Sequence, residues 1–403
     1  MTQVLPKGWE EKNLDTLCEI NIGKTPLRAD SSYWDKNKET NNIWLSISDL
    51  QNTTNKQVYS SKEFLSDKGA KIVPLIDVGT LLLSFKLTIG RVAFAGVPLR
   101  TNEAIAQLPI RNNNVIDKYY LYYYLQSYDY EKLLKGDVKV KGKSLNKAKL
   151  KQLDVKFPSL PEQKRIVEKL DKIFADIDKA KEQTTQNLKN AQEVFESSLD
   201  AVLTKEAAKW PEKKLNDVCI VERGSSPRPI KSFITTAPDG VNWIKIGDCS
   251  GKYVTSTSQK ITPEGAKKSR YVRRGDFIIS NSMSYGKPYI MDLDGYIHDG
   301  WFVLRLNHSI LVADFLYYIL SSPFAKRQYD TLAAGAIVQN ISSDLIKKVQ
   351  FNLPPLAEQK RLVARLDDLQ TKIQELEKIY TQKLADLDEL KQSVLQQAFS
   401  GKL

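Results

Sequence analysis

The sequence predicts an α+β protein in which two similar α/β domains are separated by two long antiparallel helices that form an intramolecular coiled coil. Three observations support this prediction. One segment occurs twice at a fixed spacing, the repeated segment has the pattern of a long amphipathic helix, and the blocks before the two copies share their strands and turns. The internal repeat also predicts a pseudo-two-fold relation between the halves of the chain.

The repeated segment reads PSLPEQKRIVEKLD at residues 158–171 and PPLAEQKRLVARLD at residues 354–367, an offset of 196 residues. Prolines at the start and an early glutamate are typical of a helix N-terminus. Each copy continues for about 40 residues without glycine or proline, which corresponds to about 60 Å of helix. We therefore expect one long helix at 158–204 and a second at 354–403.

Apolar residues recur along both helices at steps of mostly three and four, which is the spacing of a coiled-coil seam. A helix of this length extends beyond a domain of ordinary size, so its apolar stripe needs a partner of equal length. The alternative is that each helix packs separately on its own domain. The predicted seam contains Leu170, Ile173, Ile177, Leu188, Leu366, Leu369, Ile373 and Leu384.

The remaining blocks, residues 1–157 and 205–353, are predicted to be the two domains. Period-two alternation, β-branched residues and turn signals predict strands in both blocks. In the first block we expect strands at 14–23 and 43–50, two strands within 79–96 and a tyrosine-rich helix at 117–134.

The second block repeats the plan of the first with low identity. Trp210, Leu215, Cys219, Gly224 and Pro227 match Trp9, Leu14, Cys18, Gly23 and Pro26. The apolar residues and turns correspond, whereas the polar residues between them differ. This pattern is typical of one scaffold that recognises two different ligands.

The net charge of +12 is confined to the two predicted domains. Residues 1–150 carry 22 Lys and Arg against 16 Asp and Glu, and residues 205–352 carry 21 against 14. The two helices together are close to neutral. A basic excess in two separate domains favours two contacts with a polyanion, although a soluble domain can also be basic without one.

The sequence contains no convincing catalytic, metal or nucleotide motif. Three cysteines and two histidines without a CxxC pair make a zinc site improbable. Residues 352–356 (NLPPL) lack the aromatic residue that an adenine methyltransferase motif needs to stack a flipped base. The glycine–lysine–serine run at 136–144 does not fit the spacing of a phosphate-binding loop. No apolar run reaches the length of a membrane span, and no signal peptide is evident, so we expect a cytoplasmic protein.

The LPEQKR and LAEQKR helix starts, the Gly-X-(Thr/Ser)-Pro loops of both blocks and the closing FSGKL resemble the specificity subunit of type I restriction-modification enzymes. The resemblance covers the whole chain. It implies two target-recognition domains, at 1–157 and 205–353, that each read one half of a bipartite double-stranded DNA target. It also implies that the helices at 158–204 and 354–403 act as spacers and dock two methyltransferase (modification) subunits.

Restriction subunits would complete such a complex. The resemblance implies no catalysis and no cofactor in this chain, because S-adenosylmethionine would be bound by the methyltransferase subunit. Two other readings remain open: a standalone DNA-modifying enzyme, and a coiled-coil adaptor whose basic domains bind proteins. Binding to duplex DNA that weakens sharply with salt would exclude the adaptor.

Candidate DNA-binding residues are polar or basic residues on loops beside the predicted strands. Base edges require Arg, Lys, Asn, Gln, Asp or Ser, whereas phosphate contacts need only positive charge or amides. In the first domain the candidates are Lys24, Thr25, Arg28, Lys86, Arg91, Lys141 and Lys143. In the second domain they are Arg228, Lys245, Asn281, Ser282, Tyr285, Lys287, Gln339 and Asn340.

Overall fold

The structure, a computed structural model, describes residues 5–51, 53–134, 145–281, 286–333 and 342–403. It divides into two compact units. The first unit comprises Met1–Gln183 and Lys383–Leu403, and the second comprises Thr184–Gln382. Each unit therefore contains one of the two globular blocks together with a part of each long helix.

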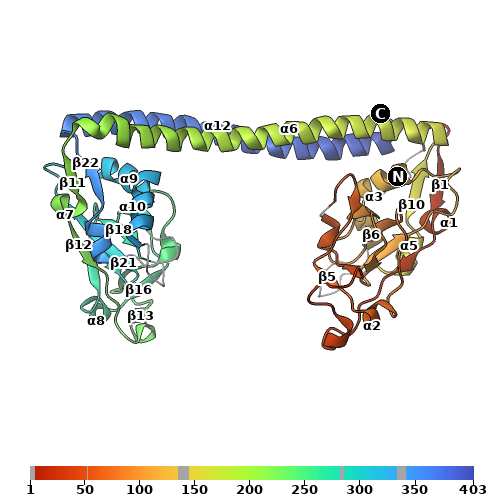
Figure 1. Ribbon diagram of the computed structural model, residues 1–403, viewed down its shortest axis with the longest axis horizontal. Helices are drawn as coiled ribbons and strands as arrows, with labels where there is room; N and C mark the ends of the chain where they lie inside the picture. Colours follow the sequence, from red (N-terminus) through yellow and green to blue (C-terminus); the bar gives the residue numbers. More distant parts are fainter. Residues whose placement is uncertain (1–4, 52, 135–144, 282–285, 334–341) are drawn as a thin grey trace. The chain divides into compact units, whose positions relative to one another are not determined.

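Two long helices are present where the sequence predicts them (Figure 1). Helix α6 spans Leu160–Ala201 and helix α12 spans Leu356–Phe399, with 42 and 44 residues. Side-chain contacts within each unit show that the helices are packed antiparallel. These contacts are Asp178 with Lys391 and Lys181 with Asp388 in the first unit, and Gln192 with Glu377 in the second.

The apolar stripes of both helices pack on the globular blocks as well as on each other. In the first unit, Ile166 and Phe174 of α6 share one core with Leu395 of α12 and with the sheet. In the second unit, Leu199 of α6 and Leu362 of α12 share the core in the same way. The two packing arrangements considered from the sequence therefore coexist. Leu170, Ile177, Leu366 and Ile373 are buried, whereas Ile173, Leu188, Leu369 and Leu384 are half-buried.

The first unit contains three described sheets, with strand orders β2-β9-β6-β7-β4, β5-β3-β8 and β1-β10. The strands are β1 (Glu10–Asn13), β2 (Asn21–Ile22), β3 (Ile43–Leu45), β4 (Gln57–Val58), β5 (Glu63–Phe64), β6 (Leu81–Ser84), β7 (Val92–Ala95), β8 (Arg100–Thr101), β9 (Ile105–Leu108) and β10 (Asp154–Phe157). The helices besides α6 and α12 are α1 (Leu14–Leu17), α2 (Asp67–Ala70), α3 (Lys118–Ser127), α4 (Glu131–Leu134) and α5 (Lys147–Lys151), with 3₁₀ turns η1 (Ser31–Tyr33) and η2 (Asp49–Gln51).

The second unit has described sheets of strand order β12-β21-β18-β19-β15, β13-β16-β14-β20-β17 and β11-β22. The strands are β11 (Glu212–Lys214), β12 (Cys219–Arg223), β13 (Ile234–Thr235), β14 (Val241–Ile244), β15 (Tyr253–Val254), β16 (Gln259–Ile261), β17 (Arg270–Val272), β18 (Phe277–Ser280), β19 (Pro288–Met291), β20 (Gly295–Ile297), β21 (Trp301–Leu306) and β22 (Gln350–Asn352). The helices are α7 (Leu215–Val218), α8 (Pro263–Ala266), α9 (Ala313–Ser321), α10 (Pro323–Ala333) and α11 (Ser343–Lys347), with short turns η3 (Val202–Glu206), η4 (Ala207–Lys209), η5 (Ile230–Ser232) and η6 (Ile246–Asp248).

The two units have the same topology, which confirms the repeat inferred from the sequence. Each sheet of the first unit has a counterpart of identical strand order in the second, and β13 and β17 extend one of these sheets. The central strands β6, β7 and β9 are buried along their whole length, as are β18 and β19. Strands buried on both faces read as continuous apolar runs, which explains the apolar sequence at 79–96.

Three expected elements differ from the structure. The predicted strand at 43–50 ends at Leu45, because the buried Asp49 carboxylate accepts hydrogen bonds from the Ser46 amide and hydroxyl and curls the chain into a turn. The segment 14–23 begins with the short helix α1. The helix predicted at 117–134 breaks at Tyr128, which is extended, into α3 and α4.

The glutamine of the repeated EQKR motif fixes each long helix to its own unit. Gln163 is fully buried, and its amide accepts from the Asp117 N–H at 2.8 Å and donates to the carbonyls of Val115 and Pro158. Its side-chain oxygen also holds the N-terminus of α3, since Asp117 is the residue that caps that helix. A buried amide whose donors and acceptor are all satisfied gives a defined helix position.

Gln359 makes the same set of bonds in the second unit. It is fully buried, accepts from the Val312 N–H at 2.8 Å, and donates to the carbonyls of Ile310 and Pro354, both at 2.8 Å. Val312 precedes α9 as Asp117 precedes α3. The repeated motif is thus a clamp between the start of each long helix and the helix that covers the sheet.

Candidate nucleic-acid interface

In the first unit, the loop after β2 is fastened to the end of β8 and to the residues that follow it. Gly23 approaches this part of the chain so closely that a Cβ atom would lie 2.1 Å from the Thr101 carbonyl oxygen. The Lys24 amide donates to the same oxygen at 2.9 Å, and the Thr25 hydroxyl donates to the Glu103 carboxylate. The candidate Thr25 therefore holds the loop, while the Lys24 side chain is exposed.

The second unit fastens its equivalent loop in the same way. A Cβ atom at Gly224 would lie 2.0 Å from the His298 carbonyl oxygen. The Ser226 hydroxyl donates to Asp299 at 2.7 Å, and the Arg228 guanidinium donates to the same carboxylate at 2.8 Å. The hydrogen bond from Ser226 and the nearby Arg228 charge lower the pKa of Asp299, so the carboxylate stays ionised.

Glu103 and Asp299, the acceptors of these two loops, were not predicted as site residues. They lie 196 residues apart, which is the offset of the helix repeat. The offset was visible in the sequence and could have identified the pair. Their side chains show that the Gly-X-(Thr/Ser)-Pro pattern works together with an acid about 75 residues further along the chain.

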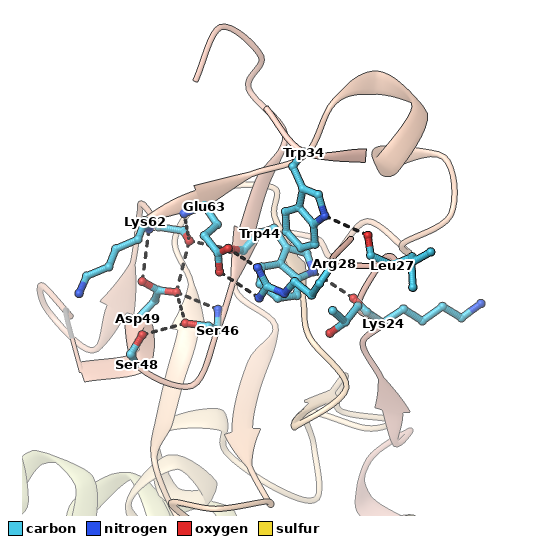
Figure 2. Close-up of polar contacts among 12 residues, drawn as sticks. Lys24, Leu27, Arg28, Trp34, Trp44, Ser46, Ser48, Asp49, Lys62 and Glu63 are labelled. Carbon is cyan, nitrogen blue, oxygen red and sulfur yellow. Dashed lines mark hydrogen bonds and ion pairs between the residues drawn. The ribbon is translucent and has the colours of Figure 1, made fainter. Parts of the chain in front are cut away.

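Arg28 lies in a cluster with Trp34, Trp44 and Glu63, which we call the Arg28 cluster (Figure 2). The guanidinium carbon is 4.2 Å from the Trp34 ring centroid and 4.6 Å from that of Trp44. The two terminal guanidinium nitrogens, Nη1 and Nη2, donate to the Glu63 carboxylate, the second of them at 3.1 Å. A planar cation held on aromatic rings and in a two-point ion pair is positioned by the protein.

The Arg28 cluster also holds the loop that carries Lys24. The Trp44 indole N–H donates to the Lys24 carbonyl at 3.0 Å, and the Trp34 indole N–H donates to the Leu27 carbonyl at 3.3 Å (Figure 2). A cleft of about 420 Å³ opens on the outer side of the cluster. Its lining includes Lys36, Lys38 and Lys62 as well as Arg28, Trp34 and Glu63 of the cluster. The exposed positive charge near this loop therefore comes from these lysines together with Lys24 and Arg28.

An aspartate-capped turn follows the strand that carries the tryptophan in each unit. Asp49 accepts from the Ser46 amide at 2.8 Å, and Asp248 accepts from the Lys245 amide at 2.9 Å. Burial alone would raise the pKa of Asp248, but hydrogen bonds from Ser258 and Lys245 outweigh it and lower that pKa. The turn fixes the candidate Lys245 through its backbone and leaves its side chain half-exposed.

The second unit has a cavity of about 1080 Å³ beside its fastened loop. We call it the second-unit cavity. Its lining includes Pro229, Ile230, Ile234 and Trp243 together with the candidates Arg228 and Lys245, as well as Gln259, His298 and Asp299. The Arg228 side chain is 77% exposed.

The remaining described candidates lie near the turns β6–β7 and β18–β19. Arg91 donates from its guanidinium to the Ile47 carbonyl at 3.2 Å, and the buried Asn281 donates to the Asp299 carbonyl at 3.0 Å. These two side chains support loops. Lys86 is half-exposed and Lys287 is exposed, so both are accessible to a ligand.

Six candidates lie outside the described residues: Lys141, Lys143, Ser282, Tyr285, Gln339 and Asn340. Among the residues that the structure describes, no three His, Cys, Asp or Glu side chains form a group that could hold a metal ion. No described helix is long and apolar enough to cross a membrane. Cys18 and Cys219 are buried, and burial raises the pKa of each thiol to about 12.

Several curated proteins are similar to this chain. The putative type I restriction enzyme specificity subunit S.HindORF215P of Haemophilus influenzae is 28% identical over 65% of this chain and 66% of its own length. The MjaIX specificity subunit of Methanocaldococcus jannaschii is 27% identical over 55% and 54%, so the match spans only about half of that relative. The EcoBI specificity subunit of Escherichia coli is 25% identical over 89% and 86%.

Solved structures show the same fold at lower identity. A chain from a study of complex assembly and conformational transition of the type I R-M system has a TM-score of 0.77 and 21% identity, and the match covers 99% of this chain and 100% of that one. The HsdS subunit from Thermoanaerobacter tengcongensis has a TM-score of 0.58 and 20% identity, with coverage of 99% and 98%.

The family described as type I restriction modification DNA specificity domain matches residues 6–190 and 208–385, which together make up most of the chain. Each match covers most of one of the two units, whose sheets have the same strand order. The chain therefore belongs to the type I restriction-modification DNA specificity family, as a specificity subunit with two copies of the domain.

Proposed function

We propose that this chain selects the DNA target of a type I restriction-modification complex, and that each domain reads one half of a bipartite sequence. The observation that carries the proposal is the pair of matched loops. Both are fastened by a glycine and by a hydroxyl–carboxylate bond, yet they present different side chains. Two equivalent frames with different outward residues suit two different half-sites.

The proposed first domain is residues 1–157 and the proposed second domain is residues 205–353, with the spacer helices at 158–204 and 354–403. The described residues proposed to contact DNA are the accessible cations Lys24, Lys86, Arg228, Lys245 and Lys287. Lys141, Lys143, Ser282, Tyr285, Gln339 and Asn340 stay proposed contacts. We propose a loop-holding role for Thr25, Arg28, Arg91 and Asn281, whose side chains are bonded to the protein. Arg228 is bonded to Asp299 as well, but its side chain is 77% exposed.

The partners of the chain would be two methyltransferase subunits docked on the long helices, with restriction subunits in the full complex. Methyl transfer from S-adenosylmethionine would then take place in the methyltransferase subunits, and the complex would act in the cytoplasm. The chain contributes binding energy and orientation, since basic domains bind the phosphate backbone and base contacts select the sequence.

Methylation mapping tests the function directly. The chain is expressed with its methyltransferase subunits in a host without either, and the methylated adenines are located. A two-part motif with a fixed spacer is expected, and it should vanish when this chain is omitted. Methylation that persists without the chain would overturn the proposal. Binding of the complex to duplex DNA should also weaken steeply with salt, which a protein-binding adaptor would not show.

The long helices are further proposed to set the spacer. Four residues inserted after Thr184 and after Tyr380 lengthen each helix by about 6 Å and keep the apolar stripe nearly in register. Because DNA rises about 3.4 Å per base pair, the methylated half-sites should then lie one or two base pairs further apart. An unchanged spacer in an active, folded complex would show that the helices do not set the distance.

A further inference from the structure

The second domain has an open cavity where the first domain has a filled site, and we propose that this cavity receives one unstacked base of the bound DNA. The proposal rests on the DNA-reading function above and adds a site and a ligand group to it. The cavity has a volume of about 1080 Å³, and its walls are mostly apolar, with Pro229, Ile230, Ile234 and Trp243 among them. Pockets of this composition, with a few polar groups, are typical of ligand sites.

Strand register identifies the equivalent site in the first domain. Trp44 of β3 pairs with Glu63 of β5. Trp243 of β14 pairs with Gln259 of β16 in the same way. The Arg28 guanidinium, which lies over Trp44 and is bonded to Glu63 (Figure 2), therefore occupies in the first domain the place that is open in the second.

Two sequence differences open the cavity. Trp34 of the Arg28 cluster forms an isolated antiparallel β-bridge with Leu65, and Ile234 makes the equivalent backbone pair with Ile261. An isoleucine therefore stands in place of the tryptophan. In the two loops Gly23 and Pro26 match Gly224 and Pro227, an offset of 201 residues. At this offset Pro229 stands in place of Arg28. The side chain that fills the site and one of the rings that holds it are thus both absent from the second domain, and Ile234 is 40% exposed.

The filled site shows what kind of group fits. In the first domain the occupant is planar, lies against apolar rings and is hydrogen-bonded along its edge. A nucleobase has the same properties. Gln259 replaces the Glu63 carboxylate with an amide that can both donate and accept, which suits the edge of a neutral base better than that of a guanidinium.

Charge at the rim indicates a nucleotide rather than an apolar side chain of a protein partner. Arg228, Lys231 and Lys245 line the cavity. Of the described lining residues, Asp299 alone carries a carboxylate, and that carboxylate already accepts from Ser226 and Arg228. An apolar cavity with cations at its rim fits a base inside and its phosphate at the entrance.

A mismatch scan tests the proposal. Removing a base from the stack costs free energy, and the cost falls when that base is already mismatched. The complex of this chain with its methyltransferase subunits is titrated with duplexes of the mapped target. Each duplex has one altered base in the strand opposite to a position of the half-site read by the second domain. At the displaced position the mismatch should tighten binding about tenfold, whereas mismatches at contacted pairs should weaken it.

A mismatch opposite the methylated adenine should tighten binding in a similar way, because methyltransferases flip their target base. We call such an increase in affinity the gain at that position. The proposal therefore requires a second position with this behaviour. Ile234→Trp, which fills the cavity, should abolish the gain at that second position and retain the gain at the adenine. Gln259→Glu, which copies the first domain without adding volume, should reduce the same gain severalfold.

Ile220→Trp is the matched control, because Ile220 is an exposed isoleucine on β12 of the same domain and does not line the cavity. It should retain both gains. The proposal is wrong if only the adenine position gains, or if the second gain survives both cavity variants. If neither half of the methylated sequence depended on the second domain, that result would contradict the proposed function instead.

Discussion

The loops of the two units share the hydroxyl–carboxylate bonds that fasten them and differ in what they surround. Thr25 with Glu103 and Ser226 with Asp299 are the same device at matching positions. Beside the first pair, Arg28 fills the space against its tryptophans, and beside the second pair the space is a cavity. The comparison shows that the repeat conserves the bonds that hold the loop while the adjoining surface changes freely.

Both units also share the glutamine clamp, and its removal should have the largest effect on stability. Gln163→Leu or Gln359→Leu removes an amide that satisfies one N–H and two carbonyls in a buried site. Each change should lower the free energy of unfolding by about 2–4 kcal/mol, because unsatisfied buried polar groups are costly. Urea unfolding measures the loss.

Hydrogen exchange shows where the loss occurs. Gln163→Leu should increase exchange around α3 and leave α9 protected, and Gln359→Leu should do the reverse. Gln374→Leu on the exposed face of α12 is the control, with little effect expected. If either clamp variant loosened neither helix, or loosened both equally, the glutamines would not be local clamps.

The filled site of the first unit can be opened by Arg28→Met, which keeps most of the stem and removes the planar cation. Loss of the two-point ion pair and of the contacts with Trp34 and Trp44 should cost about 1 kcal/mol, a modest figure because the pair is partly exposed. Discrimination at the first half-site should fall while the second half-site is unaffected.

Arg28→Lys should resemble Arg28→Met, because an ammonium cannot make the planar two-point contact. Methylation rates on single-base variants of the target measure the discrimination. If Arg28→Met abolished recognition of one particular base pair and left the stability unchanged, Arg28 would be a direct reader, contrary to its assignment as a loop-positioning residue.

The smallest expected effect concerns pH. Burial lowers the pKa of His298, so the unfolded chain binds a proton more readily than the folded one. The associated stability is present above the unfolded pKa of about 6.5 and is lost as the pH falls below it. In the first unit the equivalent residue is Asn102, which accepts from the Ala104 amide as His298 accepts from the Gly300 amide.

His298→Asn should therefore keep the hydrogen bond and remove the titration. Urea unfolding at pH 7.5 and pH 5.5 is compared for the two chains, and the loss of stability on acidification should be smaller in the variant. An identical pH dependence with and without His298 would rule out its contribution.

Much of the fold follows from the sequence because its signals are local or periodic. The long helices, the paired strands at 79–96 and the correspondence of the two blocks all rest on patterns of 2, 3.6 or 196 residues. The bonding of Arg28 to Glu63 could not be read in this way. Glu63 is 35 residues away, and only the folded sheet brings the two together. Isolated loop cations look alike in sequence whether they are bonded or free.

The strand end at Leu45 illustrates a second limit. Alternation predicted a strand to residue 50, but the Asp49 side chain competes for the backbone amides and turns the chain. Glu103 and Asp299 are the opposite case. Their spacing of 196 residues was available in the sequence, and comparing polar residues at that offset would have found them.

Exchange of one recognition domain shows whether each domain reads its own half-site. Residues 1–157 are replaced by the corresponding block of a relative with a different target, and the chimera is expressed with its methyltransferase subunits for methylation mapping. One half of the methylated motif should change to that of the relative, while the other half and the spacer stay the same. A change in both halves, or in neither, would contradict independent reading by the two domains.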